Sequence, residues 1–113
     1  MLFNKIHKPA MFTASIVIPC FNEEKTLRNT VGLVRAIADD TLQLEILIVD
    51  DCSGDRSPEI ARELEHEFPE VRSQHHKENQ GKGAALRTGF QHPFRPNYAT
   101  FRPTSFFIFR PTF

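Results

Sequence analysis

The 113-residue sequence has no long apolar run and no excess charge of either sign. No stretch approaches the roughly 20 apolar residues of a membrane-spanning helix. The first nine residues lack the apolar region of a signal peptide, so we expect neither feature. Lys and Arg total 14, as do Asp and Glu, which gives no hint of a nucleic-acid or membrane partner. The length allows one domain with a modest core.

Cysteine is also scarce. Cys20 and Cys52 are the only two, which is too few for a disulfide framework. Each stands just past a short apolar run, and the two thiols would lie close together if those runs were neighbouring strands. We expect both to be free thiols of a cytoplasmic protein.

Glycine is missing where the common phosphate-binding loops need it. No glycine follows the apolar run 15–20, which excludes the pyrophosphate turn of a dinucleotide fold. A G-x-G-x-x-G pattern starting at Gly81 fails because Leu86 stands in the last glycine position. A P-loop fails because His76 stands where the first glycine belongs and Gly83 where Ser or Thr belongs. A dehydrogenase or a P-loop kinase is therefore disfavoured.

What is present is an alternation of strand and helix signals. Residues 15–20 and 44–50 are short apolar runs typical of strands buried on both faces of a parallel sheet, and a weaker strand is expected at 71–75. Between them lie helical patterns with an apolar stripe. The stripes are Leu27, Val31, Val34 and Ala38 in the first helix, Ile60, Leu64 and Phe68 in the second, and Ala85, Leu86 and Phe90 in a third near 82–91. We expect Ser57 to cap the second helix. The order predicts an α/β fold of three βα units in an open, mostly parallel sheet.

The composition changes at Pro93. From there no Asp, Glu, Lys or Gly occurs, and Phe-Arg-Pro appears three times. Prolines at this density are incompatible with a helix or an interior strand. We therefore expect a lead at 1–13, a domain at 14–92 and an irregular, disordered or frameshifted tail at 93–113. The tail mixes aromatic and basic residues, but nothing around it would hold stacking surfaces in place, so we expect no nucleic-acid partner.

Two aspartates stand where the second apolar run ends, the usual ligand position in an open α/β sheet. A carboxylate there can accept hydrogen bonds from a ribose hydroxyl or a base N–H. We favour Asp51 for the ligand and Asp50 for structural support; the alternative is that one of them caps the turn at Ser53-Gly54. Adjacent strand residues point to opposite faces, so shared metal coordination is disfavoured and no metal ligand is predicted.

Two further candidates stand at helix starts. Asn22, Glu23 and Glu24 would open the first helix, where acids near the positive end of the dipole are common; beside the aspartate pair we favour a ligand role for Glu23. Lys82, between two glycines, offers a cation and exposed N–H groups for a diphosphate, although a flexible turn explains it equally well. His75 and His76 are expected to be surface residues without a role, because no further ligands stand at metal-site spacing.

Three blocks carry a family resemblance. They are Ile-Val-Ile-Pro-Cys-Phe-Asn-Glu-Glu at 16–24, Ile-Val-Asp-Asp-Cys-Ser at 48–53, and Asn-Gln-Gly-Lys-Gly-Ala-Ala-Leu-Arg-Thr-Gly-Phe at 79–90. In this order and spacing, over about residues 14–92, they resemble the N-terminal half of a family 2 glycosyltransferase of the GT-A fold. Within that family they resemble the polyprenyl- or dolichyl-phosphate mannose or glucose synthases.

The resemblance implies a site for the base and ribose of a UDP- or GDP-sugar. Its residues would be Pro19, Phe21 and Glu23, with Asp51 bonded to the base, Asp50 beside it, and Lys82 near the diphosphate. It also implies transfer of the hexose to a lipid-phosphate or glycan acceptor, with Mg²⁺ or Mn²⁺ held by Asp-x-Asp on a fourth strand. No Asp-x-Asp occurs here and the later catalytic base is absent. We therefore expect the chain to be inactive and assign no catalytic residue.

The missing fourth strand has a structural consequence. In the family it pairs beside the first strand, so we expect Ile16-Val17-Ile18 to form a bare apolar edge prone to self-association. The alternatives are a non-catalytic nucleotide-binding remnant, a fragment that needs a partner chain, another α/β nucleotide enzyme, and an unfolded fragment. We expect a cytoplasmic location, or the cytoplasmic face of a membrane if the acceptor is a lipid phosphate.

Overall fold

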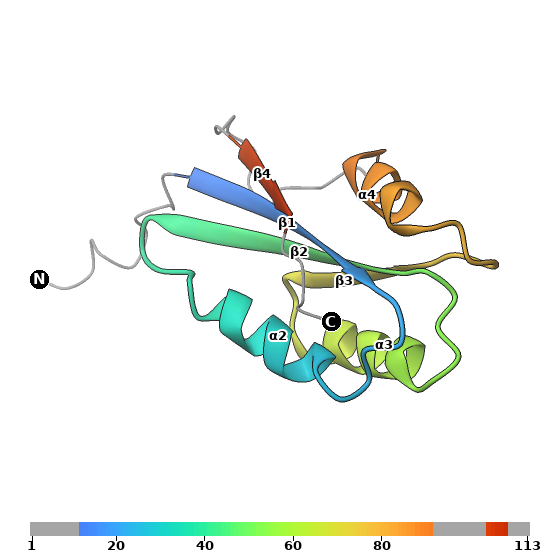
Figure 1. Cartoon of the computed structure of the whole chain (residues 1–113). Coiled ribbons are helices and arrows are strands. Elements are labelled where there is room, and N and C mark those ends of the chain that lie inside the picture. The colour runs from blue at the N-terminus through green and yellow to red at the C-terminus, as the bar shows by residue number, and fades with distance from the viewer. Residues whose placement is uncertain (1–11, 92–103, 109–113) are drawn as a thin grey trace, which may run out of the picture.

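Parallel strands with helices between them organise this chain (Figure 1). The computed structural model describes residues 12–91 and 104–108. The elements in chain order are β1 (Phe12–Cys20), α2 (Leu27–Arg35), β2 (Leu42–Asp50), α3 (Ser57–Glu67), β3 (Val71–His75), α4 (Lys82–Gln91) and β4 (Thr104–Ile108). Across the described part of the sheet the order is β3-β2-β1-β4, and every neighbouring pair is parallel. The three predicted βα units are confirmed.

Helices cover both faces of the sheet, with α2 and α3 on one side and α4 on the other (Figure 1). Successive strand residues alternate between these faces. Ile16 and Ile18 of β1 belong to the larger core beneath α2 and α3. Val17 belongs to a smaller core with Leu47 and Ala85, on the α4 side. Burial on both faces explains why β1 and β2 are nearly continuous apolar runs.

The helices present most of the apolar stripes that their periodicity predicts. Leu27, Val31 and Val34 of α2 are completely buried, whereas Ala38 is exposed and lies beyond the end of the helix. Ile60 and Leu64 of α3 are also buried, but Phe68 follows the end of that helix and is partly buried. In α4 Ala85 is buried and Leu86 partly buried, and the side chain of Phe90 lies outside the described part of the chain. No helix within residues 12–91 is long and apolar enough to cross a membrane.

Two predicted helix starts are wrong. The first helix begins at Leu27, not at Asn22–Glu24; Asn22 instead takes a positive φ of 54° in the preceding loop. Ser57 is the first residue of α3 rather than its cap. Its hydroxyl accepts a hydrogen bond from the amide of Glu23, 2.7 Å away. The N-cap of α3 is Arg56, one residue earlier than expected. The amide of Ser57 donates to Asp55 Oδ1 at 2.9 Å.

The prediction of a bare β1 edge is wrong as well. β4 pairs with β1 in a parallel register that runs from Thr13↔Thr104 to Val17↔Ile108. Five residues of the expected tail therefore form a strand, at the edge of the described sheet where the prolines around it are tolerated. The rest of the expected tail lies outside the described residues. So do residues 1–11 of the expected lead, whereas Phe12 and Thr13 belong to β1.

Candidate nucleotide-sugar site

A cleft of about 390 Å³ opens at the carboxyl ends of β1 and β2, beside the start of α4. Open α/β sheets bind their ligands at this edge. The residues that line the cleft are Pro19, Cys20, Phe21, Asp51, Asn79, Gly81, Lys82 and Ala85. They include four of the six predicted site residues and come from three separate blocks of the sequence. Glu23 and Asp50 are not among them.

Hydrogen bonds join the loop after β1 to the loop after β2. Asn22 donates its amide to Ser53 Oγ at 2.8 Å and accepts from the Gly54 amide through Oδ1 at 2.8 Å. Glu24 makes a similar pair of hydrogen bonds. Its amide donates to Asp55 Oδ2 at 3.1 Å, and its Oε1 accepts from the Arg56 amide at 2.9 Å. We call residues 21–26 and 51–56 the loop pair. It fixes the position of Phe21 relative to Asp51.

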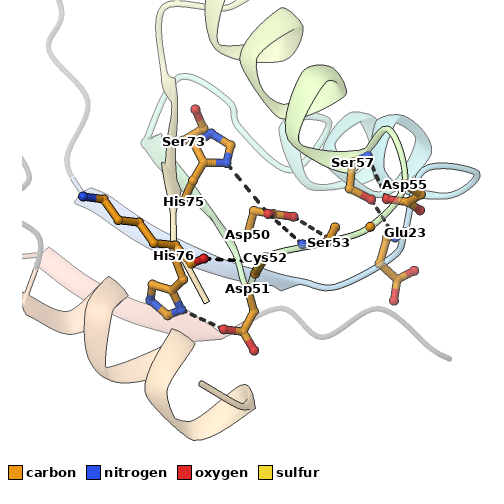
Figure 2. Close-up of polar contacts among 12 residues, drawn as sticks. Glu23, Asp50, Asp51, Cys52, Ser53, Asp55, Ser57, Ser73, His75 and His76 are labelled. Atoms are coloured by element: carbon orange, nitrogen blue, oxygen red, sulfur yellow. Dashed lines mark hydrogen bonds and ion pairs between the residues drawn. The ribbon is translucent and has the colours of Figure 1, made fainter. Parts of the chain in front are cut away.

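Asp50 stabilises the second loop of the loop pair by accepting hydrogen bonds from Ser53. Its side chain is almost completely buried, and it accepts hydrogen bonds from Ser53 Oγ at 2.6 Å and from the Ser53 amide at 3.1 Å (Figure 2). This is the turn-capping arrangement that the sequence left open as an alternative. A direct contact between Asp50 and a ligand stays a prediction.

Glu23 is also fixed by hydrogen bonds to other residues of the protein. It is 6% exposed, its amide donates to Ser57 Oγ, and its Oε1 accepts a hydrogen bond from Thr26 Oγ1 at 2.7 Å. Its main-chain oxygen also accepts from the Leu27 amide at 2.8 Å, which starts α2. These contacts give Glu23 a structural task, and its predicted contact with a ligand stays a prediction.

Asp51 faces the cleft as an ionised carboxylate. Its Oδ1 accepts from His76 Nδ1 at 2.8 Å (Figure 2). The Gln80 amide also donates to Oδ1 at 2.9 Å, and the Gly81 amide donates to Oδ2 at 2.8 Å. Burial alone would raise the pKa of Asp51, but the hydrogen bonds from Gln80, His76 and Gly81 outweigh it and hold that pKa below its ordinary value. Since each carboxylate oxygen accepts about two bonds, Oδ2 keeps room for one more donor.

The start of α4 forms the opposite wall of the cleft. Gly81 has a φ of 92°, which other residues rarely adopt, and its main-chain oxygen accepts from the Ala85 amide at 3.1 Å. Lys82 is the first residue of the helix and lines the cleft. A lysine and a helix N-terminus on one wall are the combination that binds phosphate groups.

Sequence reasoning missed His76. The side chain is only 7% exposed, so its expected place on the surface is wrong. The ring lies between Asp51 and Thr88, whose Oγ1 is 2.8 Å from Nε2. One signal was available in the sequence: His76 directly follows β3, just as Asp51 directly follows β2. The side chain of His75 points toward Asp50 instead, and its Nδ1 lies 3.9 Å from Asp50 Oδ2 (Figure 2).

The two cysteines are free thiols in different surroundings. Cys20 lines the cleft wall but is 2% exposed. Burial raises its pKa to about 12, so its thiol stays protonated near neutral pH. Cys52 is exposed and has a φ of 63°.

The carboxylates of this chain do not fit a divalent cation. All 14 acidic residues lie between Glu23 and Glu78, inside the described range 12–91. In the described part of the chain, no three His, Cys, Asp or Glu side chains converge to hold a metal ion. Asp51, which lines the cleft, accepts from the amides of Gln80 and Gly81, and Asp50 accepts from Ser53. That the chain holds no metal ligand stays a prediction.

Parallel strands, helices on both faces and a cleft at the carboxyl edge define a Rossmann-like α/β half of the GT-A type. The family model of glycosyl transferase family 2 matches residues 15–101. This chain belongs to glycosyl transferase family 2.

Curated relatives agree with the family. The chain is 33% identical over 92 residues to glycosyltransferase AglD of Haloferax volcanii, with 74% of this chain and 15% of the relative covered. It is 33% identical over 96 residues to dolichyl-phosphate beta-glucosyltransferase ALG5A of Trichomonas vaginalis, with 80% and 30% covered. A third relative is the undecaprenyl-phosphate 4-deoxy-4-formamido-L-arabinose transferase of Edwardsiella ictaluri, 38% identical over 80 residues, with 69% and 25% covered. The chain thus spans less than a third of the length of these relatives.

Solved structures share the fold. The mannosyltransferase PcManGT of Pyrobaculum calidifontis, in complex with GDP-Man and Mn²⁺, has a TM-score of 0.61 at 24% identity over 72% of this chain and 24% of its own. TarS 1–349 of S. aureus, in complex with UDP, has a TM-score of 0.50 at 25% identity over 67% of this chain and 24% of its own.

Proposed function

We propose that this chain binds the nucleotide part of a UDP- or GDP-sugar in the cleft, as the donor-binding half of a family 2 glycosyltransferase. The observation that carries the proposal is the meeting of Phe21, Asp51 and Lys82 around one cleft of about 390 Å³. This volume lies within the roughly 300–1,000 Å³ of small-molecule sites. Three blocks that are distant in sequence thus supply an aromatic ring, an acceptor and a cation to one ligand-sized space.

Each side chain suits one part of a nucleoside diphosphate. Phe21 is 42% exposed and offers a ring face, with Pro19 beside it, on which a base stacks. Asp51 Oδ2 accepts an N–H of the base, a contact that both uracil and guanine can make. Lys82 and the first turn of α4 meet the diphosphate.

The acceptor is a lipid phosphate or a glycan. The names of the relatives support the lipid phosphate, since two of them carry dolichyl-phosphate or undecaprenyl-phosphate in their names. The neighbouring structures support the donor, because one holds GDP-Man and another UDP. We place the reaction at the cytoplasmic face of a membrane, where a lipid-phosphate acceptor would lie.

We further propose that the 113-residue chain binds the donor without transferring the sugar. In metal-dependent transferases a divalent cation stabilises the departing diphosphate, and the carboxylates described above form no site for one. No acidic residue follows Glu78 that could act as the base toward the acceptor.

Calorimetric titration of the purified chain with UDP and with GDP tests the binding. We expect Phe21→Ala and Lys82→Ala each to weaken binding about tenfold, as expected for loss of a stacked base or a charged contact. Leu33→Ala and Lys25→Ala are matched controls, because both side chains are exposed and neither lines the cleft. Absence of binding to either nucleotide, or equal losses in the controls, would contradict the proposal.

A turnover assay tests the second part. The chain is incubated with UDP-glucose or GDP-mannose, Mn²⁺ and a polyprenyl phosphate, and release of the free nucleotide diphosphate is followed. We expect no release above the rate without protein. Protein-dependent release together with glycolipid formation would overturn the expected inactivity but not the donor site.

A further inference from the structure

The imidazole of His76 joins the second strand of the site to α4. Nδ1 lies 2.8 Å from Asp51 Oδ1, and Nε2 lies 2.8 Å from Thr88 Oγ1. Asp51 stands at the end of β2, His76 follows β3, and Thr88 is in α4. The ring is therefore a bridge between the acceptor that faces the cleft and the helix whose first turn forms the opposite wall.

The chemistry of the groups fixes the direction of the bond between His76 and Asp51. A carboxylate can only accept, so Nδ1 carries a hydrogen and donates it to Asp51. In the neutral ring Nε2 is then an acceptor, and the hydroxyl of Thr88 donates to it. Both ring nitrogens are satisfied in a side chain that is 7% exposed, which makes this orientation costly to change.

Asp51 needs this bridge because its other two partners are both on one segment. The amides of Gln80 and Gly81 donate to Oδ1 and Oδ2, respectively, and both belong to the turn before α4. His76 is the side-chain donor that approaches from β3 instead. A carboxylate bonded from two directions keeps its plane, and the remaining accepting position of Oδ2 then stays directed to the cleft that Asp51 lines.

We propose that His76 is a positioning residue for nucleotide binding. It holds the Asp51 carboxylate for the N–H of a uracil or guanine base, and its second bond, to Thr88, keeps the ring in place. The inference rests on the proposed function of the cleft. His76 does not line the cleft, so it acts on the ligand through Asp51.

Three variants separate positioning from a general loss of structure. His76→Ala removes both bonds. His76→Asn keeps an N–H close to the place of Nδ1 and loses only the bond to Thr88. Thr88→Val removes only the hydroxyl. His66→Ala is the matched control, because His66 is an exposed histidine of α3 that does not line the cleft.

The first readout is the dissociation constant for UDP and for GDP by calorimetric titration. We expect His76→Ala to weaken binding about tenfold, the effect of losing a buried bond to a charged group. His76→Asn and Thr88→Val should stay within about threefold of the unaltered chain, and His66→Ala should not differ from it. An unaltered dissociation constant in His76→Ala, or a loss in His76→Asn as large as in His76→Ala, overturns the positioning role.

The second readout does not need a ligand. In ¹H–¹⁵N spectra of the free chain, the amides of Gln80 and Gly81 report their bonds to Asp51. We expect both resonances to move in His76→Ala and to return toward their original positions in His76→Asn. If the unaltered chain binds neither nucleotide, the proposed function fails, and unmoved Gln80 and Gly81 resonances would overturn the positioning role separately. If His76→Ala does not fold, His76→Leu, which has no N–H but fills more of the space of the ring, replaces it in both readouts with the same expected results.

Discussion

The side chain of Val17 fills the space in which a β-carbon on Gly89 would lie. A methyl group added at Gly89 would be 2.5 Å from Val17 Cγ1 and 2.8 Å from Cγ2, distances that real side chains do not adopt. α4 can approach β1 this closely because position 89 is a glycine. Through this contact α4, which carries Lys82, packs against β1, which carries Pro19.

Gly89→Ala should therefore lower the free energy of unfolding by about 1–3 kcal/mol, as overpacked cores do. Urea denaturation followed by circular dichroism measures the change. Gly83→Ala is a control in the same helix, since a β-carbon there would be 3.6 Å from Arg87 Nη1, an ordinary contact. The double variant Val17→Ala with Gly89→Ala should recover part of the loss. A Gly89→Ala chain as stable as the original would contradict the close packing.

Gly81→Ala should destabilise the turn that leads into α4. Gly81 has a φ of 92°, and a residue with a β-carbon is held in a left-handed conformation at a cost of about 1–2 kcal/mol. Gly32→Ala is the opposite case, because Gly32 lies in α2 with open space around it, and alanine there should raise the stability by up to about 1 kcal/mol. The urea midpoint of each variant is compared with that of the original chain. If the two substitutions shift the midpoint equally, the backbone at Gly81 is not strained.

Asp51 should make the stability of the fold depend on pH in the acidic range. Hydrogen bonds hold its pKa below the ordinary value of 3.8 in the folded chain. A carboxyl with a depressed pKa contributes stability above its unfolded pKa, and this contribution is lost as the pH falls through the folded pKa. Asp51→Asn should thus lower the free energy of unfolding by about 1–3 kcal/mol at pH 7, with a smaller difference from the original chain below pH 3.8.

Urea denaturation at a series of pH values from 7 to about 2 measures this dependence, since acid denaturation arises from such carboxylates. Asp40→Asn removes one exposed carboxylate from the loop before β2 and serves as the control. A gap between the original chain and Asp51→Asn that is as wide at the lowest pH as at pH 7 would be incompatible with the hydrogen bonds described here.

Cys52 should react with iodoacetamide in the folded chain, and Cys20 should not. The thiolate is the reactive form; burial raises the pKa of Cys20 to about 12, whereas Cys52 is exposed. Intact-mass analysis at pH 8 should show one added group in the original chain, none in Cys52→Ala and one in Cys20→Ala. Both cysteines should react in urea. Two groups added at the same rate without urea would show that Cys20 is accessible.

The strands and the main site residues could be predicted because their signals are local. An apolar run of β-branched residues predicts a buried strand wherever it lies, and a polar residue directly after such a run is placed at the ligand edge of the sheet. Asp51 was found in this way, and Lys82 by its place between two glycines at a helix start; both line the cleft. The bounds expected for β3 and α4 match those observed.

The other features depend on contacts between distant residues. Ser57 has the sequence of a helix cap, yet its hydroxyl is used by Glu23, which is 34 positions earlier. His76 pairs with Asp51 across 25 positions, and no local pattern indicates that partner. β4 was missed for a related reason: its pairing with β1 joins segments at opposite ends of the chain, and the prolines around it disguise a five-residue strand.

The loop pair has a consequence for the order in which the fold opens. Its bonds run between main-chain amides of one loop and side chains of the other, so no single loop can leave without breaking several of them together. Hydrogen exchange would therefore see the amides of Asn22, Glu24, Gly54 and Arg56 as one cooperative unit with a shared opening free energy. The ends of β1 and β2 then form one rigid side of the cleft.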